Sequence, residues 1–208
     1  MRSSILSAVA VLGILSPLAA NAQGRPTQAE IIASCESCHG RDGQTRNPTT
    51  PRLNGQTREY LIARLKDLRN PGNQTVSAIH NMLWPARGLL ESDIPALAAH
   101  FAAQKPNSPA GRARGRDAGA LLYARGDSTR SPYAPGEGAR LPSCASCHGD
   151  AGQGQGEAPR LAGQHASYLV DQMEALMLTA RFQPGMNRHA QLLTPQEIRD
   201  LAAFLAGD

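Results

Sequence analysis

The sequence predicts an all-α protein in which two similar helical lobes are joined by a linker. Three observations predict this fold class: an internal repeat, apolar residues at helical spacing, and helix-start signals in both halves. The segment PRLNGQ at 51–56 returns as PRLAGQ at 159–164, and Tyr60 then matches Tyr168 at the same offset of 108 residues. Such a repeat indicates a tandem duplication, so each half should fold as one unit.

The first lobe opens with a helix-start signal. Thr27-Gln28-Ala29-Glu30 has the spacing of a capping box, in which the threonine and the glutamate each satisfy a backbone N–H group at the helix start. We expect this helix to continue into the cysteine-containing segment 35–39.

A second helix is predicted in the middle of each half. Leu61, Leu65 and Leu68 recur at i, i+4 and i+7, the spacing that places side chains on one face of a helix. The second half keeps this spacing with Leu169, Met173 and Leu176. We expect these two faces to pack into the cores of the lobes.

A closing helix is predicted at the end of each half, because the apolar segment 94–101 aligns with 198–205. Thr194 and Glu197 form a second capping box, with Pro195 at the first helical position, where proline removes no helical hydrogen bond. Loops rich in glycine and proline separate the helices. No stretch alternates apolar and polar residues over the length of a strand, so no strand is predicted.

The two halves are separated by a segment that lacks core-forming residues. Residues 104–119 contain prolines, glycines, four basic side chains and almost no large apolar residue, which is typical of an exposed linker. We therefore expect the first domain at 23–104, the linker at 105–116 and the second domain at 117–208.

The N-terminus predicts export. Arg2 precedes an apolar run at 5–20, and Ala20-Asn21-Ala22 has the small-residue pattern of a cleavage site. The run is shorter than the roughly 20 residues that a spanning helix needs, which favours a signal peptide at 1–22, cleaved after Ala22, over an uncleaved anchor. The expected location is the periplasm, and the sequence leaves open a peripheral association with the membrane.

All four cysteines lie in two copies of the pentapeptide Cys-x-x-Cys-His. This pattern is typical of covalent c-type haem attachment, because two thiols one helical turn apart can each add to a vinyl group of one porphyrin. Disulfides, a thioredoxin-like redox pair and zinc sites are the alternatives. The immediate histidine and the following glycine, both found twice, favour haem. We predict two c-type haems, attached through Cys35, Cys38, Cys144 and Cys147 and ligated by His39 and His148.

Composition agrees with a bound cofactor and excludes one class of partner. Aromatic residues make up 4% of the chain, which is thin for two cores, and a porphyrin would add apolar surface to each. The formal charge of +4 falls to +3 once Arg2 is removed, and no dense basic run occurs. We therefore expect no nucleic-acid partner.

The second axial ligand of each iron separates an electron carrier from an enzyme. Aligning the halves through their closing helices, at an offset of 104 residues, places Met82 on Met186. No other methionine is paired in this register, so we predict these two as ligands rather than as core residues. His80 lies two residues before Met82 and stays open as the alternative ligand in the first lobe.

These residues resemble the cytochrome c4 group of bacterial diheme cytochromes, in which each half is similar to a class I cytochrome c. The resemblance covers essentially the whole mature chain, because the haem motif, the Pro-Arg-Leu-x-Gly-Gln block, the methionine and the alanine-rich final helix all occur twice. It implies that His39 and Met82 ligate the first iron, and that His148 and Met186 ligate the second.

The resemblance also implies supporting roles around the haems. Pro51 and Pro159 would offer backbone carbonyls to the imidazole N–H groups and so fix the ring orientation. The chain departs from the family at Pro85 and His189, where a second methionine is common, and its 71–84 loop is longer than the counterpart in the second half. Four side chains are candidates for holding haem propionates or the lobe interface, against an ordinary solvated or core role: Arg52, Arg160, Tyr60 and Tyr168.

The predicted function is that of a one-electron carrier in a respiratory chain, without enzymatic activity of its own. The resemblance implies a quinol-oxidising complex as donor and a terminal oxidase as acceptor, with transient docking. The alternative is an electron-transfer subunit of a periplasmic dehydrogenase that oxidises sulfide or an alcohol. A haem enzyme with one open iron is the least favoured reading.

Overall fold

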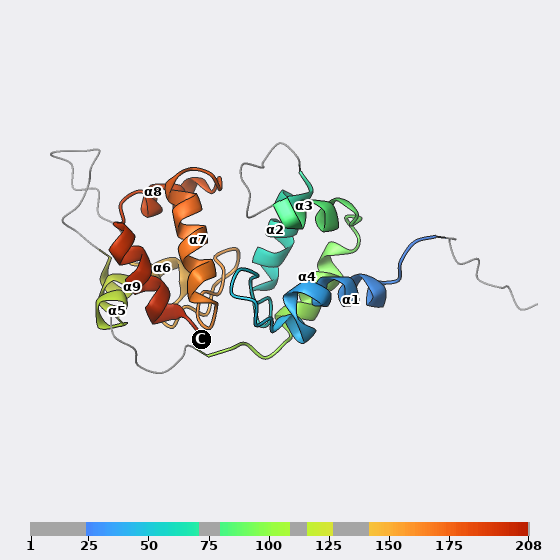
Figure 1. Cartoon of the computed structure of the whole chain (residues 1–208), viewed down its shortest axis with the longest axis horizontal. Coiled ribbons are helices and arrows are strands. Elements are labelled where there is room, and N and C mark those ends of the chain that lie inside the picture. Colours follow the sequence, from blue (N-terminus) through green and yellow to red (C-terminus); the bar gives the residue numbers. More distant parts are fainter. Residues whose placement is uncertain (1–23, 71–79, 109–115, 127–141, 208) are drawn as a thin grey trace, which may run out of the picture.

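The helices gather in two groups that lie end to end along the long axis of the molecule (Figure 1). The computed structural model describes residues 24–70, 80–108, 116–126 and 142–207. The first group comprises α1 (Gln28–His39), η1 (Arg41–Gly43), α2 (Arg58–Arg69), α3 (His80–Arg87) and α4 (Ile94–Ala102). The second comprises α5 (Arg116–Arg125), α6 (Ala145–His148), α7 (Ala166–Met177), α8 (Pro184–Ala190) and α9 (Pro195–Leu205). The main helix–helix contacts lie within one group or the other.

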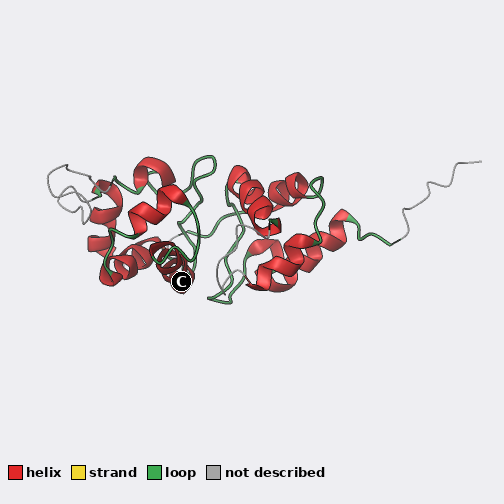
Figure 2. Cartoon of the chain, turned by 90° about the horizontal axis from the view of Figure 1, so that it is seen from above, coloured by secondary structure: helices red, strands yellow, loops and turns green. Residues whose placement is uncertain are grey.

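The all-α prediction is confirmed. Figure 2 shows helices and loops only, and the part of the chain that the structure describes contains two isolated β-bridges but no strand. The predicted signal peptide at 1–22 and the segment 109–115 of the predicted linker lie outside the described residues.

Both predicted capping boxes are formed. Thr27 Oγ1 accepts from the N–H of Glu30, and the Glu30 carboxylate accepts from the N–H of Thr27, at the start of α1. Thr194 and Glu197 make the same pair of bonds at the start of α9. The cap fixes where α1 begins, and its twelve residues then carry the whole first pentapeptide. The second pentapeptide lies on the much shorter α6, with Cys144 at the N-cap.

The two lobes have cores of different size. The first contains a small buried cluster of Leu61, Ala98 and Phe101, to which α2 and α4 contribute. The second has a larger cluster of buried side chains: Tyr123, Leu169, Leu193, Ile198, Leu201, Ala202 and Leu205. Among the residues that the structure describes, the first lobe therefore has the smaller buried apolar cluster to stabilise it.

The lobes meet through the two copies of the repeated segment. Arg52 and Gln56 of the first copy bond to Gly163, Gln164 and Arg160 of the second, across 104 to 112 residues of sequence. Two further bonds join neighbouring loops, from Ser167 Oγ to the Pro48 carbonyl and between His165 Nε2 and the Thr45 carbonyl. The repeat thus contributes to the interface as well as to each lobe.

Helices α5 and α9 cross closely at Gly119. A Cβ atom at this position would overlap the carbonyl group of Asp200, so the crossing requires glycine. We expect Gly119→Val to lower the free energy of unfolding of the second lobe by about 1–3 kcal/mol, because the helices must separate to admit the side chain. Guanidinium denaturation measures the loss. Ala118→Val, on the exposed side of the same helix, is the control, and an equal effect of both variants would contradict the close crossing.

Candidate functional site

A cavity of about 480 Å³ is lined by residues of both lobes. Both pentapeptides reach it, through Cys35 and His39 of the first and through Cys144, Cys147 and His148 of the second. Leucines from α2, α4, α7 and α9 make much of the rest of its wall apolar. Cys38 is exposed and is not among the residues that line the cavity. The fold therefore brings the two motifs, 109 residues apart in sequence, to one apolar space.

The cysteines do not form the disulfides that were one alternative. All four are described, and none is bonded to another. Burial raises the pKa of the Cys144 thiol to about 11 and also raises the pKa of Cys35. A reactive redox pair or a zinc thiolate requires a lowered thiol pKa. The environment of Cys35 and Cys144 is thus unsuited to either, whereas an apolar wall suits a porphyrin.

Both motif histidines are buried, and each has one ring nitrogen already engaged. The Nδ1 atom of His39 lies 2.9 Å from the Pro51 carbonyl oxygen, and that of His148 lies 2.8 Å from the Pro159 carbonyl oxygen. A carbonyl can only accept, so Nδ1 carries the hydrogen and Nε2 keeps its lone pair. Burial lowers the pKa of both histidines, which keeps them neutral. A neutral imidazole held in this way is the usual form of a metal ligand.

The two methionines that the repeat aligns both line the cavity. Met82 lies on α3 and Met186 on α8, and each is half-buried. Met186 is positioned by its neighbour Asn187, whose Nδ2 donates to the carbonyls of Leu176 and Arg181 and whose Oδ1 accepts from the Gln183 N–H. The equivalent position after Met82 is Leu83, so α3 lacks this brace.

Two histidines lie close enough to the methionines in sequence to be alternative axial ligands. His189, one turn after Met186, also lines the cavity, and burial lowers its pKa. The sequence gives no signal for this, because the histidine has no counterpart in the first half. His80, the alternative ligand of the first lobe, begins α3, but its side chain lies outside the described part of the structure.

Arginine and tyrosine side chains meet where the lobes face each other across the cavity. Arg181 donates from Nη2 to the Tyr60 hydroxyl at 3.2 Å and from Nη1 to Gln172 at 2.8 Å. Burial and the Arg181 charge both lower the pKa of Arg64. Burial acts to raise the pKa of the Tyr60 hydroxyl, but the charges of Arg181 and Arg64 outweigh it and lower the pKa. Two guanidinium groups therefore place positive charge at this point of the cavity.

The charge of Asp67 acts on Arg64 and Arg181 from a distance, but these arginines have no ion-pair partner among the described side chains. Neither Arg64 nor Arg181 lies within salt-bridge distance of a described carboxylate. The Nε atoms of Arg181 and Arg160 are also buried without a hydrogen-bond partner. Unpaired buried charge is costly, so these groups call for an anion. Haem propionates are carboxylates, and the residues around the cavity therefore fit haem at both its apolar and its charged parts.

The comparison of the two halves did not predict Arg64 or Arg181, because neither has an arginine at the matching position of the other half. The counterpart of Arg64 at the 108 offset is Gln172, which instead binds Arg181. The one sequence signal for Arg64 is its spacing one turn after Tyr60, which predicts that the two side chains lie on the same face of the helix. The four side chains that the sequence did single out all line the cavity: Arg52, Arg160, Tyr60 and Tyr168.

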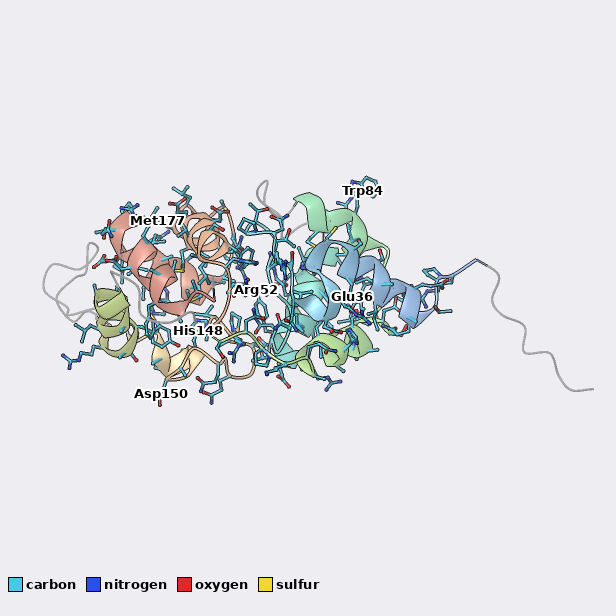
Figure 3. All side chains as sticks on the ribbon, turned by 60° about the horizontal axis from the view of Figure 1, so that its bottom comes forward. Glu36, Arg52, Trp84, His148, Asp150 and Met177 are labelled. Atoms are coloured by element: carbon cyan, nitrogen blue, oxygen red, sulfur yellow. The ribbon has the colours of Figure 1, made fainter. Side chains whose placement is uncertain are left out.

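The predicted arginines lie at the junction of the lobes, where Figure 3 shows Arg52 between them. Arg52 Nη1 donates to the Gly163 carbonyl at 2.8 Å, and Arg160 Nη2 donates to the carbonyl of Asn107 on the linker at 3.0 Å. These two guanidinium groups thus donate to backbone carbonyls of the other lobe or of the linker, which is an interface role.

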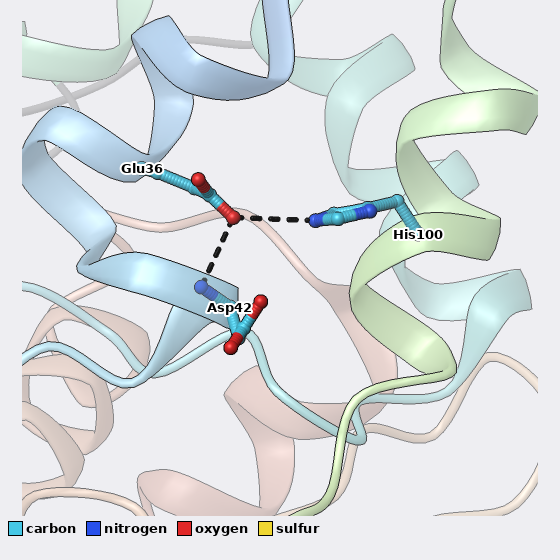
Figure 4. Close-up of side chains that lie close together, drawn as sticks. All are labelled: Glu36, Asp42 and His100. Carbon is cyan, nitrogen blue, oxygen red and sulfur yellow. Dashed lines mark hydrogen bonds and ion pairs between the residues drawn. The ribbon is translucent and has the colours of Figure 1, made fainter. Parts of the chain in front are cut away.

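A separate polar cluster joins three elements of the first lobe. Glu36 Oε1 accepts from the Asp42 N–H at 3.0 Å and lies 3.3 Å from His100 Nε2 (Figure 4). Glu36 belongs to the first pentapeptide, Asp42 to η1 and His100 to α4. The cluster therefore ties the motif helix to the closing helix. The second lobe has Ala145 at the position of Glu36 and makes no such tie.

Comparisons with known proteins point to c-type cytochromes. The family model described as Cytochrome c matches residues 134–207. The chain is 30% identical to cytochrome c4 from Azotobacter vinelandii, over 100% of this chain and 99% of that protein. A solved cytochrome c4 structure from Acidithiobacillus ferrooxidans superposes with a TM-score of 0.74 at 33% identity and covers 84% of this chain and 99% of its own. A protein named thiosulfate dehydrogenase electron acceptor, from Thiomonas intermedia, is 34% identical over 81% of this chain and 73% of its own length.

Proposed function

The chain belongs to the cytochrome c4 family of diheme electron carriers, and on this basis we propose that it carries electrons in the periplasm from a quinol-oxidising complex to a terminal oxidase. The observation that carries the proposal is the convergence of both motif histidines and both aligned methionines on one cavity. With both axial positions taken, an iron has no position left for a substrate.

Each haem would be held by residues of its own lobe. Cys35, Cys38 and His39 would attach the first, with Met82 as its second axial ligand. The second lobe would use Cys144, Cys147, His148 and Met186 in the same roles. When bound, each haem supplies an iron that accepts and releases one electron. The protein fixes the imidazoles through Pro51 and Pro159 and offers buried guanidinium groups to the propionates.

The periplasmic location and the lobe boundaries are part of the proposal. The segment 1–22 would be removed after Ala22, leaving lobes at 23–104 and 117–208 with the linker at 105–116. In the described part of the chain, no helix has both the length and the apolar character needed to cross a membrane. The proposed mature form reaches its partners by transient docking.

Reduction and reoxidation of the purified holoprotein test the function. We expect a quinol-oxidising membrane fraction to reduce both haems, and a terminal oxidase to reoxidise both without forming a stable complex. The reduced protein should not bind carbon monoxide at neutral pH, because both axial positions are taken. A haem that binds carbon monoxide in the native protein would instead indicate an enzyme with an open iron.

A second candidate is the electron-acceptor subunit of a thiosulfate dehydrogenase, which the similarity to the Thiomonas intermedia protein favours. Such a subunit commits its surface to one stable partner, whereas a carrier releases it. Size-exclusion chromatography of the protein mixed with a thiosulfate dehydrogenase separates the two. Elution as a stoichiometric complex that passes electrons from thiosulfate would establish this second function, and separate elution would leave the carrier.

A further inference from the structure

Two buried glutamines, Gln56 and Gln164, form reciprocal bonds across the lobe interface. The Gln164 side chain accepts from the Arg52 N–H at 2.9 Å and donates to the Arg52 carbonyl at 3.0 Å. Gln56 accepts from the Arg160 N–H at 2.6 Å and donates to the Arg160 carbonyl at 3.0 Å. We call these contacts the glutamine clasp. Its two halves are equivalent under the repeat, so the lobes pack with approximate two-fold symmetry.

The orientation of each clasp amide is fixed by the backbone. Gln164 Oε1 accepts a second bond from the His165 N–H at 3.0 Å, and Gln56 Oε1 accepts one from the Thr57 N–H at 2.9 Å. Two N–H donors require an oxygen at this position, which settles which end of the amide is which. Both glutamines are only 7% exposed, so water does not compete for these bonds.

The clasp meets the peptide groups that hold the motif histidines. The Pro51 carbonyl, which accepts from His39 Nδ1, belongs to the same peptide group as the Arg52 N–H, which donates to Gln164. One continuous chain of hydrogen bonds therefore runs from the imidazole of the first lobe, through a single peptide group, to a side chain of the second lobe. The peptide group between Pro159 and Arg160 joins His148 to Gln56 in the same way.

We propose that each glutamine of the clasp is a positioning residue that lowers the reduction potential of the haem in the opposite lobe. The proposal rests on the proposed roles of His39 and His148 as axial ligands. A peptide group whose N–H donates a hydrogen bond becomes polarised, and its carbonyl becomes a stronger acceptor. A stronger acceptor draws the imidazole proton and makes the histidine more basic. A more basic axial ligand stabilises ferric over ferrous iron, so the potential falls.

The test replaces one glutamine and follows each haem separately. In Gln164→Met the Arg52 N–H loses its acceptor, so the haem ligated by His39 should become easier to reduce, although the substituted residue lies in the other lobe. We expect the electron-exchange equilibrium between the haems to shift by about two- to tenfold, the effect of one hydrogen bond. Tenfold corresponds to about 59 mV for a one-electron couple.

Potentiometric titration of the isolated holoprotein, with the two haems distinguished by their paramagnetic NMR signals, measures this shift. The proton on His39 Nδ1 should also move to higher field as its hydrogen bond weakens. Gln56→Met is the mirror variant and should act on the haem ligated by His148. Gln196→Met, an exposed glutamine on α9, is the matched control and should shift neither.

A shift of the haem in the substituted lobe, equal shifts of both haems, or no shift would overturn the proposal, because each points to local packing or to no role. If Gln164→Met does not bind both haems, Gln164→Glu keeps the oxygen acceptor and should lower the potential of the His39 haem more than that of the other. The titration needs no redox partner, so it stays valid if the oxidase is the wrong acceptor. Failure of the ligand assignment would show separately, as an altered ligation spectrum of the wild type.

Discussion

Substituting Met186 by alanine should remove the contribution of the second haem to the weak red absorption band that marks sulfur-to-iron bonding in the oxidised protein. Met82→Ala should remove the contribution of the first, and the double variant should abolish the band. Each loss follows from the proposed role of the thioether as the sixth ligand, and both methionines line the cavity. The potential of the affected haem should also fall by a large part of the roughly 0.8 V range over which axial ligands tune haem.

The control is Met177→Leu, because Met177 packs against the core of the second lobe and is absent from the cavity lining. This variant should keep the whole band. The ligand assignment fails for a lobe whose methionine can be replaced without loss of its share. A wild-type band of only half the expected intensity would point to a histidine ligand in one lobe, and His80 and His189 are the candidates by position.

Replacing His39 by alanine should lower the free energy of unfolding of the first lobe by more than about 3 kcal/mol, the size associated with loss of a metal or cofactor. His148→Ala should act on the second lobe in the same direction, but by less. The difference follows from the cores, because the first lobe has a small buried cluster around Leu61 and Phe101 whereas the second has a larger one. A lobe with little packing of its own depends more on its cofactor.

Guanidinium denaturation followed by far-ultraviolet circular dichroism measures these losses, and haem staining of the denatured chain reports whether attachment has survived. His100→Ala is the matched control, since it removes a histidine of the first lobe that pairs with Glu36 outside the cavity. It should cost about 1 kcal/mol or less, as expected for a partly exposed pair. If His39→Ala had the same unfolding midpoint as this control, the haem would not be part of the core that stabilises the lobe.

Much of the fold follows from local patterns. The capping boxes at Thr27 and Thr194 are formed where the sequence predicts them, because a cap depends on residues within one turn of each other. Leu61, Leu68, Leu169 and Leu176 are buried as their helical spacing predicts. The second pentapeptide shows the limit of such patterns. Its helix α6 is only four residues long, although its sequence is close to that of the first.

The functional site divides in the same way. The repeat points to Met82 and Met186 because both lobes use the same register, and both line the cavity. Three further side chains line the cavity but occur in one half only: Arg64, Arg181 and His189. Comparing the two halves therefore does not reveal them. The same holds for Asn187, because the hydrogen bonds of its side chain, which hold α8, have no counterpart at the residue after Met82.

The sequence by itself determined the two c-type haem motifs, the duplication and the all-helical class, because each is written in residues that are neighbours along the chain or repeat at a fixed spacing. Only the tertiary structure decided how the two lobes face each other. The glutamine clasp and the contact between Arg181 and Tyr60 join residues 104 to 121 positions apart. Such contacts depend on how two folded surfaces fit together, and no local spacing encodes that fit.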